Sequence, residues 1–578
     1  MTIFGGVFAL DADRQVDRGV GEHLQRALSR NSADQATLHS DSGYTAAFLD
    51  LQLLPGNGRV TDQSGAFTML AGDLLLRPRL QASRDSDLQT FHRSWLEGDD
   101  SPLAKMRGSF AVAQIDPARG VLRLAVDVLG ARSLYVAFTD GLVYFATALR
   151  ILEQLPMLER RIDRRGLFET VAFGFPLATR TQYRGVELLY GGEVLEIRRG
   201  GGVRRQRHSR LEDSRDRAPA PHDLASELHR SFREAVRWRR DDSPSVVALF
   251  SGGLDSRCVV AALRADGVAV HSINVAPEGS LDLELGRVAA RHLQTNHFEF
   301  PDGSDDGFER VAAGHASWLS SLEPESRPRS PCAAWSGHGG SVAMGHVYLD
   351  DPMIELMRQG RRADAVDVYL RNNNIGLSAK GFRREFRGCA ESVCAKGVMD
   401  ELQQLDSFEE GRRLHLFLML NDQRRHLTFH HENLDLFRFE LINPFFDPEF
   451  LRLVLSAPIQ PFLCHRFYNT WLKQFPFQLD SIPWQAYEGH EPCSMPMPSG
   501  FRSQWEEDYY SHTTKRQASE QLLSQSSKAI ASNRFPSGIL RRNFFLAAWW
   551  LTRAGVRDYS YLLKTAATFT DYFSRSRP

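Results

Sequence analysis

The stretch that decides the fold is Ser245-Val246-Val247-Ala248-Leu249-Phe250-Ser251-Gly252-Gly253-Leu254-Asp255-Ser256. Its first six residues form an apolar run of the length expected for a buried parallel strand. A turn with two glycines follows, residues 258–263 continue as a helix, and residues 268–275 indicate the next strand. This order of strand, loop, helix and strand is typical of a parallel sheet, so the sequence predicts an α/β domain here.

The turn after this strand has the composition of a phosphate-binding loop. Gly252 and Gly253 let successive backbone N–H groups converge without side-chain obstruction, and the next helix adds positive potential at its N-terminus. Ser251 and Ser256 supply hydroxyl donors, and Asp255 is a candidate ligand for Mg²⁺, which prefers oxygen donors. The sequence has no G-x-x-x-x-G-K-[ST] loop and no G-x-G-x-x-G after a strand, so neither a P-loop nor a dinucleotide site is predicted.

This loop resembles the S-G-G-x-D-S loop of the asparagine synthetase superfamily, which includes β-lactam synthetases and lasso peptide cyclases. Residues 336–341 (SGHGGS) resemble the second glycine-rich loop of that family, and residues 442–447 (INPFFD) resemble its P-F-L-D segment. The resemblance implies that ATP and Mg²⁺ bind here. The nucleotide-binding residues it implies are Leu249, Ser251, Gly252, Gly253, Leu254, Asp255, Ser256, Val275, Ser336, Gly337, Gly339 and Gly340, with Asp255 as metal ligand and Asp255, His338 and His490 as catalytic residues.

The first 200 residues contain short strand-like runs, among them residues 109–113, 121–126 and 142–146. The segments GSFA (108–111) and DVLGARSLY (127–135) resemble the glutamine amidotransferase domain of the same superfamily. We therefore expect a degenerate amidotransferase domain at residues 1–205 and an ATP-pyrophosphatase or cyclase domain at residues 222–578. The implied fold is an N-terminal-nucleophile-type α+β β-sandwich followed by an α/β domain with a helical C-terminal part.

Two departures select among the branches of the superfamily. Position 2 is Thr2, whereas the amidotransferases of this family use a cysteine as N-terminal nucleophile, so we expect glutaminase activity to be lost. His338 stands where asparagine synthetases carry a glutamate, which resembles the lasso peptide cyclases, as does the segment 482–492 (IPWQAYEGHEP). Together these features imply a cyclase that adenylates an Asp or Glu side chain of a precursor peptide and joins it to the peptide's N-terminal amine.

Two further positions depart from the family pattern. Ser341 replaces a magnesium-binding aspartate of the second loop, for which Asp350 and Asp351 are candidate substitutes. The family's lysine has no match between residues 482 and 492, and Lys473, His490 or an arginine are the candidates for its role. Two alternatives stay open: a β-lactam-synthetase-like or other amide ligase acting on a small molecule, and a non-catalytic nucleotide-binding scaffold for peptide maturation.

Composition limits the partners and the location. The 70 basic and 71 acidic residues are mixed along the 578-residue chain, so no global field favours nucleic acid. No run approaches about 18 apolar residues, and the N-terminus lacks a basic leader, so we expect a cytoplasmic protein without a membrane span. The six cysteines form no C-x-x-C pair. The expected partners are a precursor peptide and a leader-peptide protease.

Overall fold

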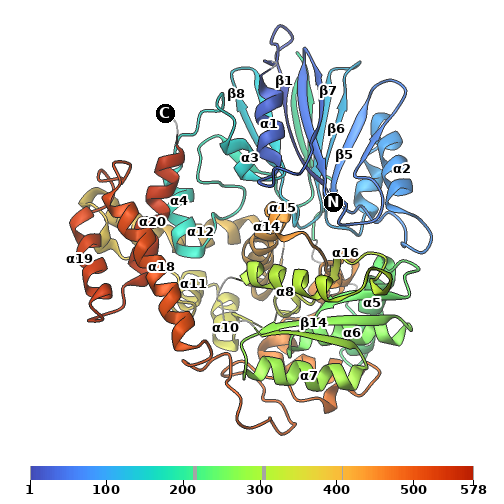
Figure 1. Cartoon of the computed structure of the whole chain (residues 1–578), viewed down its shortest axis with the longest axis vertical. Coiled ribbons are helices and arrows are strands. Elements are labelled where there is room, and N and C mark those ends of the chain that lie inside the picture. Colours follow the sequence, from blue (N-terminus) through green and yellow to red (C-terminus); the bar gives the residue numbers. More distant parts are fainter. Residues whose placement is uncertain are drawn as a thin grey trace.

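The computed structural model describes residues 2–17, 19–211, 218–301, 307–345, 347–406 and 408–576, and its first part is built on two antiparallel sheets (Figure 1). The first sheet consists, in spatial order, of β10 (Val186–Leu188), β8 (Tyr135–Thr139), β9 (Leu142–Ala146), β1 (Thr2–Ala9), β3 (Tyr44–Asp50) and β2 (Thr37–Asp41). The second consists of β12 (Gly202–Arg207), β11 (Glu193–Arg198), β7 (Val121–Val126), β6 (Phe110–Asp116), β5 (Phe67–Gly72) and β4 (Arg59–Thr61).

The two sheets face each other across one apolar core. Alternate side chains of both sheets, such as Phe4, Phe67 and Ile115, are buried in it because successive side chains of a strand point to opposite faces. Helices α1 (Val20–Leu28) and α3 (Leu149–Glu153) cover the outside of the first sheet, and α2 (Arg84–Leu96) covers the second. The predicted β-sandwich is confirmed, and the strands predicted at 121–126 and 142–146 are β7 and β9.

The second part is built on a parallel sheet with the order β15-β14-β13-β16-β17. Its strands are β13 (Ser245–Leu249), β14 (Ala269–Ala276), β15 (Asn296–Pro301), β16 (Ala333–Trp335) and β17 (Glu440–Ile442). Helices α6 (Leu254–Ala265) and α7 (Leu281–Leu293) cover one face, and α8 (Gly307–Ser321) covers the other (Figure 1). The α/β unit predicted from residues 245–275 is therefore confirmed.

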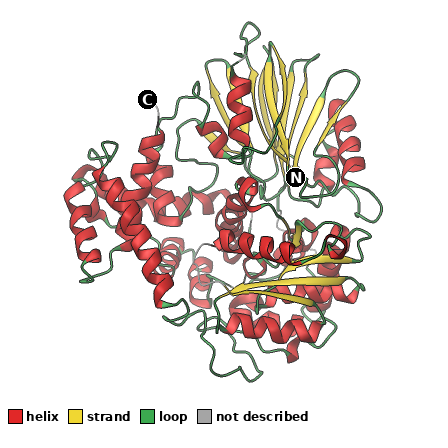
Figure 2. Ribbon diagram, in the orientation of Figure 1, coloured by secondary structure: helices red, strands yellow, loops and turns green. Residues whose placement is uncertain are grey.

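Helices dominate the rest of this part, as Figure 2 shows and as the sequence predicts. They include α5 (Leu224–Arg239) before the sheet and, after β16, α9 (Gly340–Ala343), α10 (Asp351–Arg358), α11 (Arg362–Asn372), α12 (Arg384–Gln404), α13 (Glu410–Phe417), α14 (Arg424–Glu432), α15 (Leu434–Phe437), α16 (Pro448–Ser456), α17 (Arg466–Leu472), α18 (His512–Ala531), α19 (Arg542–Arg553) and α20 (Ser560–Arg575). Where the structure describes the chain, no helix is both long and apolar enough to cross a membrane.

The C-terminal helices return to the first part of the chain. Helices α18, α19 and α20 share an apolar core with α12 and with α4 (Arg164–Phe173), so that red and cyan segments lie side by side in Figure 1. In this core the ring of Phe168 packs edge-on against Phe569 with the centroids 5.4 Å apart. The apolar run 544–551 lies in α19 and is only partly buried, because Phe545 and Trp549 are buried whereas Trp550 is 58% exposed.

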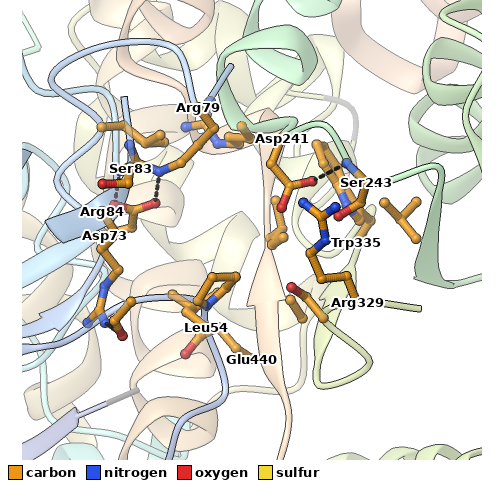
Figure 3. A pocket seen from close by; sticks show the side chains of 18 of the residues that line it. Leu54, Asp73, Arg79, Ser83, Arg84, Asp241, Ser243, Arg329, Trp335 and Glu440 are labelled. Atoms are coloured by element: carbon orange, nitrogen blue, oxygen red, sulfur yellow. Dashed lines mark hydrogen bonds and ion pairs between the residues drawn. The ribbon is translucent and has the colours of Figure 1, made fainter. Parts of the chain in front are cut away.

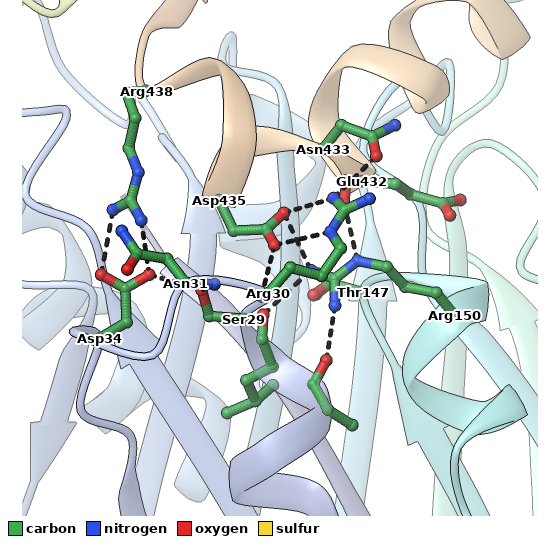
Figure 4. A network of polar contacts seen from close by, with 12 residues as sticks. Ser29, Arg30, Asn31, Asp34, Thr147, Arg150, Glu432, Asn433, Asp435 and Arg438 are labelled. Atoms are coloured by element: carbon green, nitrogen blue, oxygen red, sulfur yellow. Dashed lines mark hydrogen bonds and ion pairs between the residues drawn. The ribbon is translucent and has the colours of Figure 1, made fainter.

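Buried ion pairs join the two parts. Asp447 at the start of α16 binds Arg107 of the first part at 2.7 Å and Arg239 of α5 at 2.8 Å. In a second network, shown in Figure 4, the carboxylate of Asp435 accepts bonds from the backbone N–H and the guanidinium of Arg30. Residues 212–217 of the predicted connection lie outside the described residues, and the boundary at 205–222 stays a prediction.

Candidate active site

The predicted phosphate loop lies at the carboxyl edge of the parallel sheet, where the strand order reverses. Strand β13 leads on to β14 on one side and pairs with β16 on the other, with Ala248 opposite Trp335. The loops that follow β13 and β16 therefore lie next to each other, at the position where open α/β sheets bind ligands. They face a cavity of about 530 Å³.

Most of the predicted nucleotide-binding residues line this cavity. They are Leu249, Ser251, Gly253, Leu254, Asp255, Ser256, Val275, Ser336, Gly337 and Gly339, together with His338. Gly252 and Gly340 lie behind the lining and serve packing: a Cβ on Gly252 would lie 2.6 Å from Leu285 Cβ, and a Cβ on Gly340 would lie 2.6 Å from Asp255 Cγ.

The N-terminus of α6 faces the cavity without a side-chain cap. Its N-cap residue, Gly253, makes no side-chain capping bond, and the Gly253 N–H donates to Ser251 Oγ at 3.2 Å. The first N–H groups of a helix have no partner within the helix, and the helix dipole favours negative charge there. The loop is thus suited to bind the phosphates of ATP.

The two glycine-rich loops touch each other directly. A Cβ on Gly337 would lie 2.2 Å from the backbone nitrogen of Ser256 and 2.5 Å from the carbonyl carbon of Asp255. Contacts under 3.0 Å are essentially never made by real Cβ atoms. Gly337 is therefore required for the close approach that places both loops on one cavity.

Asp255 is held by hydrogen bonds on both carboxylate oxygens. Oδ2 accepts from the backbone N–H and the hydroxyl of Ser341, at 2.9 and 2.8 Å, and Oδ1 accepts from the buried phenol of Tyr468. Burial raises the pKa of Asp255, and the bonds from Tyr468 and Ser341 oppose this rise. Tyr468 could not be predicted as a site residue, because it is 213 positions away in an apolar run without a motif.

His338 lines this cavity, and its ring lies near those of Phe308 and His426. Its Nε2 is buried and has no hydrogen-bond partner among the described residues, while its backbone N–H donates to Ser336 Oγ at 3.0 Å. Burial, together with a smaller effect of nearby His426, lowers the pKa of His338 to about 4. The imidazole is therefore neutral near pH 7 and can accept a proton.

His490 is not among the residues that line the cavity but contacts one that does. Its Nδ1 is 2.8 Å from Nδ1 of His465, and it is His465 that lines the cavity and stacks on Tyr487. Burial lowers the pKa of His490. His490 therefore neighbours two lining residues, His465 and Tyr487, and a catalytic role with direct contact does not follow from its position.

The other substitutes considered for missing family residues lie elsewhere. Asp350 caps α10 by accepting from Met353 N at 2.8 Å, and Asp351 forms a two-bond ion pair with Arg466 at 2.9 Å. Lys473 is exposed at the end of α17. Arg310 of α8 lines the cavity, so an arginine supplies the positive charge there.

Several other residues of the cavity carry no motif by which they could be predicted. Asn274 and Asp282 come from β14 and α7, and Gln504, Tyr509 and Tyr510 come from a segment without regular structure. Asp282 accepts from the Tyr509 phenol at 2.6 Å, and burial raises its pKa. Asp255 and Asp282 are the oxygen donors that suit Mg²⁺, although no three His, Cys, Asp or Glu side chains form a metal cluster among the described residues.

Comparison with known proteins supports this assignment for both parts of the chain. Residues 74–208 match the glutamine amidotransferase domain family, and residues 227–321 match the asparagine synthase family. The second glycine-rich loop and the segment 442–447 lie beyond these matched ranges.

Curated relatives are asparagine synthetases. The glutamine-hydrolyzing asparagine synthetase 3 of Bacillus subtilis (strain 168) is 26% identical over 189 residues, which are 31% of this chain and 29% of the relative. Asparagine synthetase 2 of Arabidopsis thaliana is 26% identical over 252 residues, 41% of this chain and 38% of the relative. The chain thus spans less than half the length of these two relatives.

Among solved structures, the glutamine phosphoribosylpyrophosphate amidotransferase of B. subtilis aligns over 54% of this chain and 92% of its own at 12% identity. Its TM-score of 0.24 is too low to bear on the fold. The family matches and the asparagine synthetase relatives agree with the two-sheet and parallel-sheet parts described above. The chain therefore belongs to the asparagine synthetase superfamily, joining a glutamine amidotransferase domain to an asparagine synthase domain.

Proposed function

We propose that the chain is an ATP-dependent amide ligase that forms AMP and pyrophosphate, and that its substrate is a lasso peptide precursor. The observation that carries the ligase proposal is the pairing of the Ser251–Ser256 and Ser336–Ser341 loops around one cavity, with an uncapped helix N-terminus directed into it. Such a cavity can hold the triphosphate of ATP and present its α-phosphorus to a carboxylate.

The reaction has two balanced steps. A side-chain carboxylate oxygen of the peptide attacks the α-phosphorus, and pyrophosphate leaves. The peptide's N-terminal amine then attacks the acyl carbon, AMP leaves with the electron pair of the broken C–O bond, and one proton is released from the nitrogen. Mg²⁺, held by Asp255 with Asp282 nearby, would neutralise charge on the leaving pyrophosphate.

His338 is suited to receive the proton of the amine. Its ring is neutral near pH 7, and its Nε2 has no partner among the described residues but is buried, so the ring would turn toward the cavity before it acts. The remaining contribution of the protein is to hold amine and acyl carbon together, which can be worth roughly 7–11 kcal/mol.

The buried state of Thr2 supports an internal amine as nucleophile. Thr2 is 1% exposed, its hydroxyl has no hydrogen-bond partner among the described residues, and a Cβ on Gly58 would lie only 1.8 Å from it. The guanidinium of Arg84 is also close to this point. A glutamine substrate could not reach Thr2, so ammonia would not be generated in the first part of the chain.

The test is pyrophosphate release from Mg-ATP, with AMP and the peptide mass measured in parallel. With the precursor peptide and its leader protease, we expect one pyrophosphate and one AMP per peptide that loses one water. Release with a small amino acid alone would favour a β-lactam-synthetase-like ligase instead. No release with any of these substrates, while ATP still binds, would replace the enzyme proposal with the scaffold.

A further inference from the structure

Helix α14 presents two side chains to solvent close to the nucleotide cavity. Most of the helix is buried, and among the described residues His426 and Phe429 are its exposed positions, with Phe429 48% exposed. Residues three apart on a helix are neighbours on one face. Both side chains therefore belong to the face that α14 turns to solvent, and Phe429 places a large apolar ring there.

Aromatic rings connect this face with the cavity. The ring of Phe308, at the start of α8, has its centroid 5.4 Å from that of His338 and 6.4 Å from that of Phe429. The centroids of His426 and His338 are 6.2 Å apart. His338 lines the cavity, as does Arg310, which follows Phe308 on α8. We call Phe308, His426 and Phe429 the α14 rim, because they border the cavity on the side of His338.

A buried cluster fixes the rings of the α14 rim. Phe437 is 4% exposed, and its ring centroid lies 6.1 Å from those of both Phe308 and Phe429. The ring of the buried His430 lies 4.9 Å from that of Phe308. Phe429 thus packs against this cluster while nearly half of its surface stays open to solvent. A surface held in this way needs little ordering when a ligand binds, which favours affinity.

The nucleotide cavity is too small to hold ATP and a whole peptide. Its volume of about 530 Å³ lies within the range of about 300–1,000 Å³ found for small-molecule sites. The cavity between the β-sandwich and the parallel sheet, shown in Figure 3, offers no continuation. It shares no lining residue with the nucleotide cavity among the residues described, and its charged side chains are paired, as Arg79 is with Asp73. Most of a peptide substrate must therefore lie outside, across the rim of the nucleotide cavity.

Two parts of the rim offer exposed aromatic side chains. One is the α14 rim. The other is Trp505, which is 49% exposed and packs on Tyr487 of the cavity lining with the ring centroids 4.8 Å apart. In the proposed ligase reaction His338 receives the proton of the amine, so the amine and the acyl carbon must meet on the side of His338. This requirement favours the α14 rim as the path of the peptide.

We propose that the α14 rim binds an apolar side chain of the peptide substrate, next to the Asp or Glu that is adenylated. Phe308 and Phe429 would pack against this side chain and remove it from water, which stabilises the complex. The inference rests on the ligase proposal, which supplies the occupant and places the reaction at His338. The enzyme would then select its substrate by the residues that flank the acceptor carboxylate, in addition to the carboxylate itself.

The test is fluorescence anisotropy with two labelled synthetic peptides, in the presence of Mg²⁺ and an ATP analogue that cannot release pyrophosphate. Both peptides begin with Gly and carry one Asp. They differ only in the residues on either side of the Asp, which are Phe in one peptide and Ser in the other. We expect the peptide with Phe to bind about tenfold more tightly, because an apolar side chain is buried. Phe429→Ala should abolish this preference, and Phe429→Leu should keep most of it.

Two matched controls each remove an exposed tryptophan elsewhere. Trp505→Ala changes the other aromatic part of the rim, and Trp550→Ala changes α19, at the outer end of the C-terminal helices (Figure 1). Both variants should keep the preference for the peptide with Phe. Every variant should bind the ATP analogue normally, and circular dichroism verifies folding.

Three results would overturn the proposal: no difference in binding between the two peptides, a preference that survives in Phe429→Ala, or a preference that is lost in Trp505→Ala. The two proposals can fail separately because binding is measured without turnover. A preference that depends on Phe429, together with no pyrophosphate release from Mg-ATP, would refute the ligase and leave the α14 rim as a peptide site. Pyrophosphate release without any preference would refute the α14 rim alone.

Discussion

Ser341 donates two hydrogen bonds to a single oxygen of Asp255, from its backbone N–H at 2.9 Å and from its hydroxyl at 2.8 Å. A serine thus holds the carboxylate at the position where the sequence resemblance implies a second acid. We predict that Ser341→Asp lowers the Mg²⁺ concentration for half-maximal pyrophosphate release at least threefold, because a second carboxylate adds a metal ligand. In EDTA the same variant should melt at a lower temperature, since two carboxylates then repel. Ser320→Asp on the surface of α8 is the control, and an unchanged Mg²⁺ dependence would contradict the metal assignment.

Gly337→Ala should weaken ATP binding at least tenfold, or about 1.4 kcal/mol. The added methyl group would lie 2.2 Å from Ser256 N, so one phosphate loop must move away from the other. Titration of a fluorescent ATP analogue measures the effect. Gly388→Ala in α12, where no atom lies within 4 Å of the added Cβ, provides the matched control and should bind ATP normally.

His338→Ala should lower kcat by about 10²–10⁴, the usual contribution of a general base. His490→Ala should lower it less than tenfold, because His490 is not among the residues that line the cavity and lies behind His465 and Tyr487. With a pKa of about 4, His338 stays neutral from pH 8 down to about pH 5, so its protonation should reduce kcat/KM only in more acidic solution. An inflection of kcat/KM near pH 6.5 that disappears in the His338→Ala variant would contradict the buried environment of His338.

Asp447→Asn should lower the free energy of unfolding by about 3–5 kcal/mol, because it leaves the buried guanidinium groups of Arg107 and Arg239 without their carboxylate. Burial raises the pKa of Asp447, but the two arginines outweigh burial and hold the pKa below its usual value. The pair therefore contributes stability above about pH 4, and this contribution is lost as the pH falls through the folded-state pKa. Urea denaturation at pH 7 measures the first effect, and repeating it at about pH 2 measures the loss of this contribution. Asp364→Asn, in an exposed pair with Arg361, should change stability by no more than about 0.5 kcal/mol.

Thr2→Cys should not restore glutaminase activity. The change supplies the thiol that relatives use, but Gly58 and Arg84 still cover that side chain. Glutamate release from glutamine, followed by a coupled dehydrogenase assay, should stay at background for both proteins. Glutamate formation by the cysteine variant would show that the site is open and that only the nucleophile is missing.

Local patterns were sufficient to predict the main elements of both parts. Strand β7 begins and ends at the predicted residues. The predicted strand 245–250 is one residue longer than β13. Both could be predicted because continuous apolar runs are typical of buried strands. The loop 251–256 could be predicted because backbone convergence needs glycine in a short segment. Tyr468 and Asp282 could not be predicted, since tertiary packing brings them to the cavity from distant positions. The exposure of Trp550 could not be predicted either, since the sequence does not show that one face of α19 lacks a neighbour among the described residues.

The packing of α20 against α4 has a consequence for biosynthesis. Phe168 leaves the ribosome about 400 residues before Phe569, the ring that closes over it. Until then α12 and Phe382 can cover only part of the apolar face of α4, and the part that α20 covers stays open to solvent or to chaperones. The contact between α4 and α20 therefore forms last. A nascent protein that ends before α20 would carry an exposed aromatic surface.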